Sequence, residues 1–147
     1  EYARLRARAA PGTRIVNSYG LAEATIDSSW YEAPADALPA PTEAVPIGRP
    51  FAGTRLYVCD PAGELLPPGV PGELWIAGDG IALGYLGRAA ETVARFRPDP
   101  LVPGARACRT GDRARLAADG NVVPLGRTDA QFNLRGSRFA PGEVEAA

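Results

Sequence analysis

The residues best suited to chemistry lie near the C-terminal end of the chain, where acids alternate with arginines. An Asp-Gly pair at residues 119–120 separates two strand-like runs, and this is the strongest short-range signal for a hairpin. Such a hairpin should hold Asp112 near one end and Asp129 near the other. The residue types alone leave open what two fixed acids and a cluster of arginines bind. The polar runs are Arg-Thr-Gly-Asp at 109–112, Gly-Arg-Thr-Asp at 126–129 and Leu-Arg-Gly-Ser-Arg at 134–138.

Composition excludes several classes of protein. The 147 residues, 46% of them hydrophobic, suffice for one domain with a core or for two incomplete ones. No run approaches the roughly eighteen apolar residues of a membrane span, and the first residues are too basic and interrupted for a signal peptide. A net charge of −1 indicates neither nucleic acid nor an anionic membrane as a partner.

The lack of histidine excludes Ser-His and Cys-His hydrolases. Cys59 and Cys108 lie far apart in the sequence, so we expect buried thiols rather than a disulfide or a metal pair, and a cytoplasmic protein. Frequent glycine (17) and proline (15) favour short strands and turns over long helices.

The first part of the chain predicts a helix, a strand and a polar segment. Residues 2–10 form an amphipathic pattern that ends at Pro-Gly, and residues 14–18 favour a strand that leads into Tyr19 and Gly20. A polar segment with Glu23 follows, and such segments often carry ligand-binding side chains in α/β folds. A plain loop with Glu23 in solvent is the alternative, which spacing alone slightly favours.

The middle of the chain predicts short strands and one more helix. Strands are expected at 55–59 and 73–77, and a dense glycine segment follows at 78–85. A phosphate-binding loop is one interpretation of that segment, but no GxxxxGK[ST] pattern occurs, so β-barrel turns are favoured. Residues 88–96 predict a short surface helix, with Glu91 and Arg95 at the spacing of an i,i+4 pair. Residues 32–46, rich in Pro and Ala, predict a linker, and 142–147 the first turn of a helix.

Four sequence motifs follow one another along the chain. Asn-Ser-Tyr-Gly-Leu-Ala-Glu at 17–23 is similar to N-x-Y-G-P-T-E, and residues 72–86 are similar to G-E-L-x-I-x-G-x-G-x-A-x-G-Y-L. Residues 109–112 match R-T-G-D, and residues 126–145 are similar to G-R-x-D-x-Q-x-K-x-R-G-x-R-x-x-x-G-E-I-E. Together these motifs resemble those of the adenylate-forming enzymes, and the sequence around residues 85–100 looks most like adenylation domains of nonribosomal peptide synthetases.

The resemblance implies a mixed α/β fragment, mainly β, built around a distorted β-barrel subdomain. Residues 1–44 would end the α/β layer of the large subdomain and carry the Tyr-Gly/Glu nucleotide motif. Residues 45–128 would form the β-barrel part, and 129–147 the hinge and the start of the small C-terminal subdomain. The phosphate loop, the acid that holds the substrate amine and the late catalytic lysine are expected outside residues 1–147, so the segment alone should be inactive.

The family reaction converts an amino acid and ATP into aminoacyl-AMP and pyrophosphate, and then passes the acyl group to a phosphopantetheine thiol on a carrier-protein domain. The resemblance implies that Tyr19, with Gly20, packs on adenine, since a flat ring suits that base. Asp112 would accept hydrogen bonds from the ribose hydroxyls, and Arg127 would reach the ribose or phosphate. Glu23 would be catalytic by binding Mg²⁺, which takes one or two carboxylates beside phosphate oxygens.

The resemblance also assigns the substrate pocket and the hinge. Ser18, Ile26 and Asp27 match positions that line the amino-acid pocket, and Asp129 matches the hinge between subdomains. Among the departures from the family pattern, Ala22 replaces a threonine, Leu83 stands where an arginine is usual, and Asn133 stands where a lysine is usual.

Partners and alternatives follow from the same resemblance. The helix at 88–96 is similar to the docking region of MbtH-like proteins, and some family members carry an inserted domain after the position of Ala147. The departures at 22, 83 and 133 slightly favour a degenerate, non-catalytic module that serves as a scaffold or docking surface. A relative that activates an acyl or aryl acid is the third possibility, against which Ser18 and Asp27 count weakly.

Overall fold

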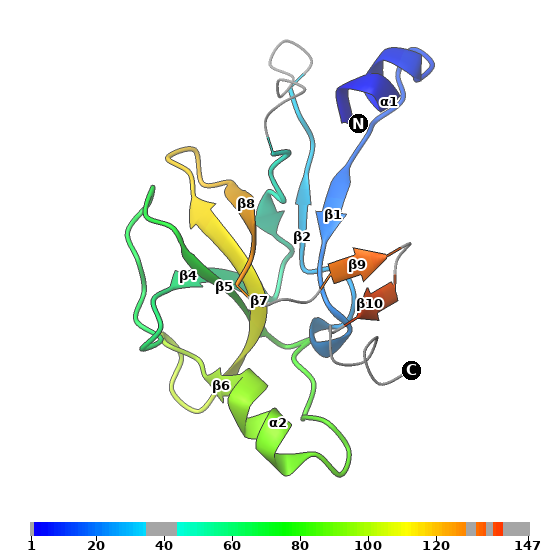
Figure 1. Ribbon diagram of the computed structural model, residues 1–147. Coiled ribbons are helices and arrows are strands. Elements are labelled where there is room, and N and C mark those ends of the chain that lie inside the picture. Colours follow the sequence, from blue (N-terminus) through cyan, green and yellow to red (C-terminus); the bar gives the residue numbers. More distant parts are fainter. Residues whose placement is uncertain (1, 35–43, 129–131, 135–136, 140–147) are drawn as a thin grey trace.

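The computed structural model describes residues 2–34, 44–128, 132–134 and 137–139. Strands dominate it, and the helices are short (Figure 1). In chain order the elements are α1 Tyr2–Arg8, β1 Asn17–Tyr19, the 3₁₀ helix η1 Ala22–Ala24, β2 Ser29–Tyr31, β3 Arg49–Pro50, β4 Thr54–Cys59, β5 Gly72–Gly78, α2 Ala89–Arg95, β6 Phe96–Pro98, β7 Arg106–Leu116, β8 Val122–Arg127, β9 Phe132–Leu134 and β10 Ser137–Phe139.

One curled antiparallel sheet organises the molecule. The order β4-β5-β7-β6 places the long strand β7 centrally, and β8 pairs with β7 as well (Figure 1). A smaller sheet, β1-β2-β3, lies beside it and carries the Tyr-Gly motif at the end of β1. The mainly β fold expected from the sequence is confirmed.

The two faces of the large sheet carry separate core clusters. Successive residues of a strand point to opposite faces, so Trp75 and Leu74 of β5 serve different clusters. The first cluster consists of Tyr57, Cys59, Trp75, Ala77 and Ala107. The second consists of Ile47, Leu74, Ala114 and Val122, with Tyr19, Leu56 and Leu116 packed against it.

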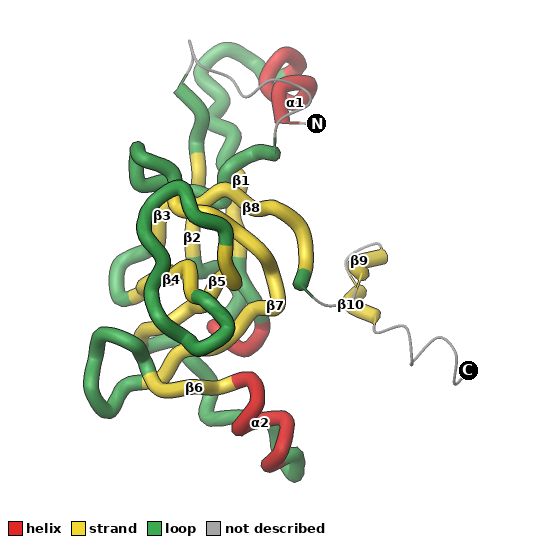
Figure 2. Tube along the Cα trace, turned by 60° about the vertical axis from the view of Figure 1, so that its left-hand side comes forward, coloured by secondary structure: helices red, strands yellow, loops and turns green. Residues whose placement is uncertain are grey.

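The hairpin predicted around the Asp-Gly pair is present. The Asp-Gly turn joins β7 to β8, and Asp112 stands opposite Arg127 in their register. The strand predicted at residues 14–18 begins further along the chain, at Asn17, as β1. A second hairpin consists of β9 and β10, and Figure 2 shows it to one side of the large sheet. Asp129, most of the expected linker and the helix turn at 142–147 lie outside the described residues.

The helices expected at residues 2–10 and 88–96 are present. Residues 2–8 form α1, and α2 ends at Arg95, one residue before β6 begins. Within the described residues, no helix has the length and apolar character needed to cross a membrane. Cys59 and Cys108 are both buried free thiols, as predicted.

Candidate nucleotide-binding site

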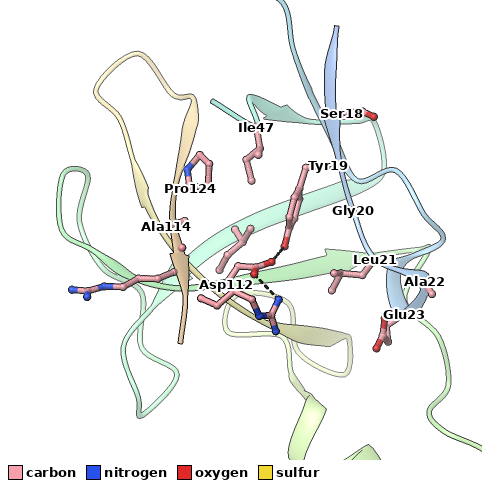
Figure 3. A pocket seen from close by; sticks show the side chains of 14 residues that line it. Ser18, Tyr19, Gly20, Leu21, Ala22, Glu23, Ile47, Asp112, Ala114 and Pro124 are labelled. Atoms are coloured by element: carbon pink, nitrogen blue, oxygen red, sulfur yellow. Dashed lines mark hydrogen bonds and ion pairs between the residues drawn. The ribbon is translucent and has the colours of Figure 1, made fainter. Parts of the chain in front are cut away.

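A cavity of about 700 Å³ lies between the end of β1 and the β7–β8 hairpin (Figure 3). Its apolar floor is the second core cluster, because Ile47, Leu74 and Ala114 line it. Its polar groups come from segments far apart in the sequence. The other lining residues are Ser18, Tyr19, Gly20, Leu21, Ala22, Glu23, Asp112, Arg113, Pro124, Gly126 and Arg127.

Asp112 is the polar centre of this cavity. Its Oδ2 accepts a short hydrogen bond from the Tyr19 hydroxyl, and its Oδ1 accepts one from Nη1 of Arg127 at 2.7 Å (Figure 3). Both partners of the Arg127–Asp112 ion pair are largely buried, with exposed side-chain fractions of 19% and 17%. The carboxylate is thus held between two elements that the sequence separates by more than ninety residues.

An irregularity in β7 aims Asp112 into the cavity. Between β5 and β7 the register shifts after Glu73, so residues 110–112 all stand against Leu74. Bulges of this kind bend a strand and redirect a side chain. The Thr110 hydroxyl completes the broken ladder, since it donates to the Leu74 carbonyl at 2.7 Å and accepts from the Asp112 N–H at 2.9 Å. Gly111 has a φ of 73°, a conformation that side chains disfavour.

Glu73 secures the other side of the same irregularity. Its Oε2 accepts from Nη2 of Arg109 at 2.7 Å, and its Oε1 accepts from the Gly111 N–H at 3.1 Å. The Arg-Thr-Gly-Asp run therefore acts as one unit: arginine and threonine anchor the bend, glycine allows it, and the aspartate faces the cavity.

Glu23 reaches the cavity from η1 and has a different support. Its Oε1 accepts a 2.5 Å hydrogen bond from the Tyr85 hydroxyl, and its backbone carbonyl accepts from the Ala82 N–H at 2.9 Å. Burial, followed by the hydrogen bond to Glu23, raises the pKa of Tyr85 to about 12. Tyr85 therefore remains a protonated donor at neutral pH.

A metal ion at this site would depend on few protein ligands. Within the described residues, no group of three or more His, Cys, Asp or Glu side chains is arranged to hold a metal ion. Glu23 is the acid that η1 contributes to the lining. One carboxylate with ligand oxygens is a common arrangement for Mg²⁺ and unusual for transition metals.

Gly20 has a structural reason to lack a side chain. A Cβ there would lie 1.5 Å from the Ile26 carbonyl oxygen, so only glycine allows the segment after β1 to fold back on itself. The two residues at that fold, Thr25 and Ile26, have positive φ angles of 58° and 66°. A β-branched residue in this region is a genuine outlier, and such strain concentrates at functional sites.

The three residues expected in the amino-acid pocket differ in their position relative to the cavity. Ser18 contributes to the cavity lining. Ile26 and Asp27 are exposed and lie outside that lining, with 71% of Ile26 accessible.

Four residues that support the site received no role from the sequence. Thr110, Glu73 and Arg109 shape the bend before Asp112, and Tyr85 holds Glu23. Each belongs to a recognisable motif, but the signal was only the motif itself, since no spacing predicts contacts between residues 23 and 85 or 73 and 111.

Comparison with known proteins agrees with this geometry. Residues 2–86 match the family model described as AMP-binding enzyme. Gramicidin S synthase 2 of Brevibacillus brevis is 51% identical over 133 residues, which are 90% of this chain and 3% of that protein. Tyrocidine synthase 3 of Brevibacillus parabrevis is 47% identical over 145 residues, 99% of this chain and 2% of that protein.

Solved structures give the same result. PA1221, described as an NRPS protein containing adenylation and PCP domains, has a TM-score of 0.80 and 33% identity over 97% of this chain and 28% of its own. NpsA-ThdA, an artificially fused adenylation-PCP di-domain from Klebsiella oxytoca, has a TM-score of 0.83 and 32% identity over 93% of this chain and 25% of its own.

The chain belongs to the family of AMP-binding enzymes, which are adenylate-forming ligases. Within that family, the relatives it matches are nonribosomal peptide synthetases and their adenylation domains. The chain spans about 2–3% of the length of the curated relatives named above.

Proposed function

We propose that this chain forms part of an amino-acid-activating adenylation domain, which makes aminoacyl-AMP from ATP and an amino acid. The acyl group then passes to the phosphopantetheine thiol of a carrier-protein domain. One observation carries this proposal: the Asp112 carboxylate is held by hydrogen bonds from Tyr19 and Arg127 in a cavity that Glu23 also lines. The volume of about 700 Å³ falls within the range of roughly 300–1,000 Å³ usual for ligand pockets.

Asp112 is the residue proposed to bind the ribose. An ionised carboxylate offers about four acceptor positions. Tyr19 and Arg127 each donate to a different oxygen of Asp112, which leaves acceptor capacity for vicinal hydroxyls without breaking either bond. The Tyr19 ring, whose hydroxyl is held in this way, presents a fixed flat surface to adenine, and Arg127 supplies positive charge beside the phosphates.

Glu23 is proposed to bind the Mg²⁺ that accompanies ATP. A bound Mg²⁺ would neutralise phosphate charge, while Glu23 fixes its place relative to Asp112 and Tyr19 in the same cavity. Ala22, which also lines the cavity, offers no hydroxyl to phosphate. We therefore expect phosphate binding to depend on groups outside the described residues.

Residues of β1 and of the loop after η1 are proposed to contact the amino-acid side chain. Ser18, Ile26 and Asp27 would contribute to that pocket, and the positive φ of Ile26 supports a functional reason for the strained turn. An acid at Asp27 suits a polar or cationic side chain. Asp129 is proposed as the hinge to the small subdomain.

Two partner proteins are proposed. A carrier-protein domain supplies the thiol, as the adenylation-PCP neighbours suggest. An MbtH-like protein would dock over α2, where Val93 is 67% exposed and Leu83 89% exposed beside a shallow depression. Co-purification with such a protein should be lost on Ala94→Arg, and unchanged co-purification would contradict this docking site.

The protein is proposed to act in the cytoplasm.

A non-catalytic scaffold is the second candidate function. Ala22 and Leu83 favour it, because each removes a polar group that the family pattern has at these positions. An acyl or aryl acid ligase would share the nucleotide site and differ in the loop at residues 26–27.

Amino-acid-dependent ATP–pyrophosphate exchange tests the proposal in the complete protein that carries this chain. Asp112→Asn should lower exchange about 100-fold, since a charge-assisted pair of hydrogen bonds contributes roughly 3 kcal/mol. The matched control is Asp119→Asn in the exposed turn, whose carboxylate accepts from the backbone and side chain of Asn121. Wild-type protein without exchange for any amino acid would favour the scaffold, and exchange with an aryl or fatty acid would favour the ligase.

A further inference from the structure

The glycine-rich segment after β5 is attached to η1 at several points. The Thr25 hydroxyl donates to the Gly80 carbonyl at 2.8 Å, and the Ala82 N–H donates to the Glu23 carbonyl at 2.9 Å. The Tyr85 hydroxyl then donates to the Glu23 side chain at 2.5 Å. Backbone bonds therefore place the turn, and the tyrosine bond places the carboxylate.

Tyr85 is itself held by α2. Its N–H donates to the Thr92 hydroxyl at 2.9 Å, and its ring packs edge-on against Phe96 at 5.5 Å between centroids. Gly84 lets this segment approach the helix, because a Cβ there would lie 2.4 Å from Cγ2 of Thr92. The phenol therefore has little freedom to move without moving α2.

We infer that Tyr85 is a positioning residue for Glu23, holding the carboxylate in place for the metal-bound nucleotide and held in turn by Thr92 of α2. The inference rests on the proposed role of Glu23 as the Mg²⁺ residue. A carboxylate on a short 3₁₀ turn has several rotamers, and a fixed donor on one oxygen restricts Glu23 to one of them at the edge of the cavity that it lines. Groups that hold a metal-binding side chain in this way commonly matter about 10- to 100-fold for metal affinity or activity.

Helix α2 also supports the second functional acid. Nη2 of Arg95 donates to the Thr110 carbonyl at 2.9 Å, two residues before Asp112. The inner face of α2 thus contacts the supports of both acids, through Thr92 and Arg95, while its outer face is exposed. Substitutions on the inner face should change nucleotide binding although none of these side chains lines the cavity.

The test is calorimetric titration of the complete protein with α,β-methylene-ATP, with and without Mg²⁺. Tyr85→Phe should reduce the gain in affinity that Mg²⁺ provides about 10-fold. It should leave metal-free binding unchanged. Tyr57→Phe is the matched control, because its hydroxyl also donates to a carboxylate, Asp99, at 3.1 Å but far from the cavity. That variant should keep the wild-type gain.

Two further variants separate positioning from folding. Thr92→Val should reduce the Mg²⁺-dependent gain in the same direction as Tyr85→Phe, and Thr92→Ser should restore it. An unchanged gain in Tyr85→Phe, or an equal loss in Tyr57→Phe, would overturn the inference. Glu23→Gln distinguishes the inference about Tyr85 from the proposed role of Glu23 on which it rests. If Glu23→Gln abolishes the Mg²⁺-dependent gain in affinity while Tyr85→Phe does not, only the inference fails. If Glu23→Gln has no effect, the proposed metal residue is wrong as well.

Discussion

The two acids of the cavity are positioned by different kinds of structure. Asp112 belongs to the central strand β7 and is held by a register shift, the Thr110 hydroxyl and the pairing with β8. Glu23 belongs to a three-residue 3₁₀ turn and is held by a loop that joins β5 to α2. One acid therefore depends on the sheet, and the other on contacts between loops.

This difference suggests a division of work between the two regions. The region of Asp112 is continuous with the core, since Leu74 and Ala114 lie under it and are fully buried. The region of Glu23 includes two residues with positive φ and exposed side chains, Thr25 and Ile26. Local opening is easiest where few apolar contacts are buried, so we expect adjustment to substrate on the Glu23 side.

The largest effect should come from the sheet. Leu74→Ala should lower the free energy of unfolding by about 2–5 kcal/mol, because it removes a fully buried side chain between β4 and β7. Urea denaturation of the complete protein measures the change. Leu83→Ala is the control, since that side chain is 89% exposed and should change stability by less than about 0.5 kcal/mol. Similar losses in both variants would break the distinction between the regions.

A smaller effect is expected at the bend of β7. Thr110→Val should cost about 1–3 kcal/mol, because it leaves the Leu74 carbonyl and the Asp112 N–H without the hydroxyl that joins them. The nucleotide affinity should fall as well, since Asp112 loses its anchor. Thr110→Ser keeps the hydroxyl and should recover most of both quantities. A Thr110→Val protein with wild-type affinity would show that the sheet alone positions Asp112.

The buried thiol of the sheet should make stability depend on alkaline pH. Burial raises the pKa of Cys59 from 9.0 to about 11, so the folded state keeps this proton longer than the unfolded chain. The resulting stability is complete below pH 9 and is lost as pH rises through 11, by an amount on the order of 1–2 kcal/mol. Denaturation at several pH values measures this, and Cys59→Ala should remove that part of the slope. An equal slope in the variant would assign it to the tyrosines.

The sheet side of the site could be read largely from the sequence. The Asp-Gly turn and the strand-favouring runs at 55–59 and 73–77 correctly predicted strands and a hairpin, and the register of that hairpin places Arg127 opposite Asp112. Local patterns suffice there because the position and type of the turn set the register of the two strands that it joins.

The turn side could not be read in the same way. Glu91 and Arg95 were expected to pair along α2, but Glu91 pairs with Arg88, and Arg95 crosses to the Thr110 carbonyl. Tyr85 and Glu23 are separated by 62 residues and meet through loops that have no periodicity. Tertiary contacts of this kind leave no spacing signal, so Tyr85 received no role from the sequence although it belongs to a motif.

The smallest effect tests whether the turn near Glu23 stores strain. Ile26 has a φ of 66°, where a β-branched residue is strained and Asn is tolerated. Because 71% of its side chain is exposed, little packing is lost on substitution, and Ile26→Asn should raise the free energy of unfolding by up to about 1 kcal/mol. Val16→Asn is the control: this residue is 47% exposed and has no positive φ, so no gain is expected. If Ile26→Asn is stabilising and slows amino-acid-dependent exchange, the strained turn serves substrate binding. If it changes neither quantity, the turn on the Glu23 side is as relaxed as the sheet.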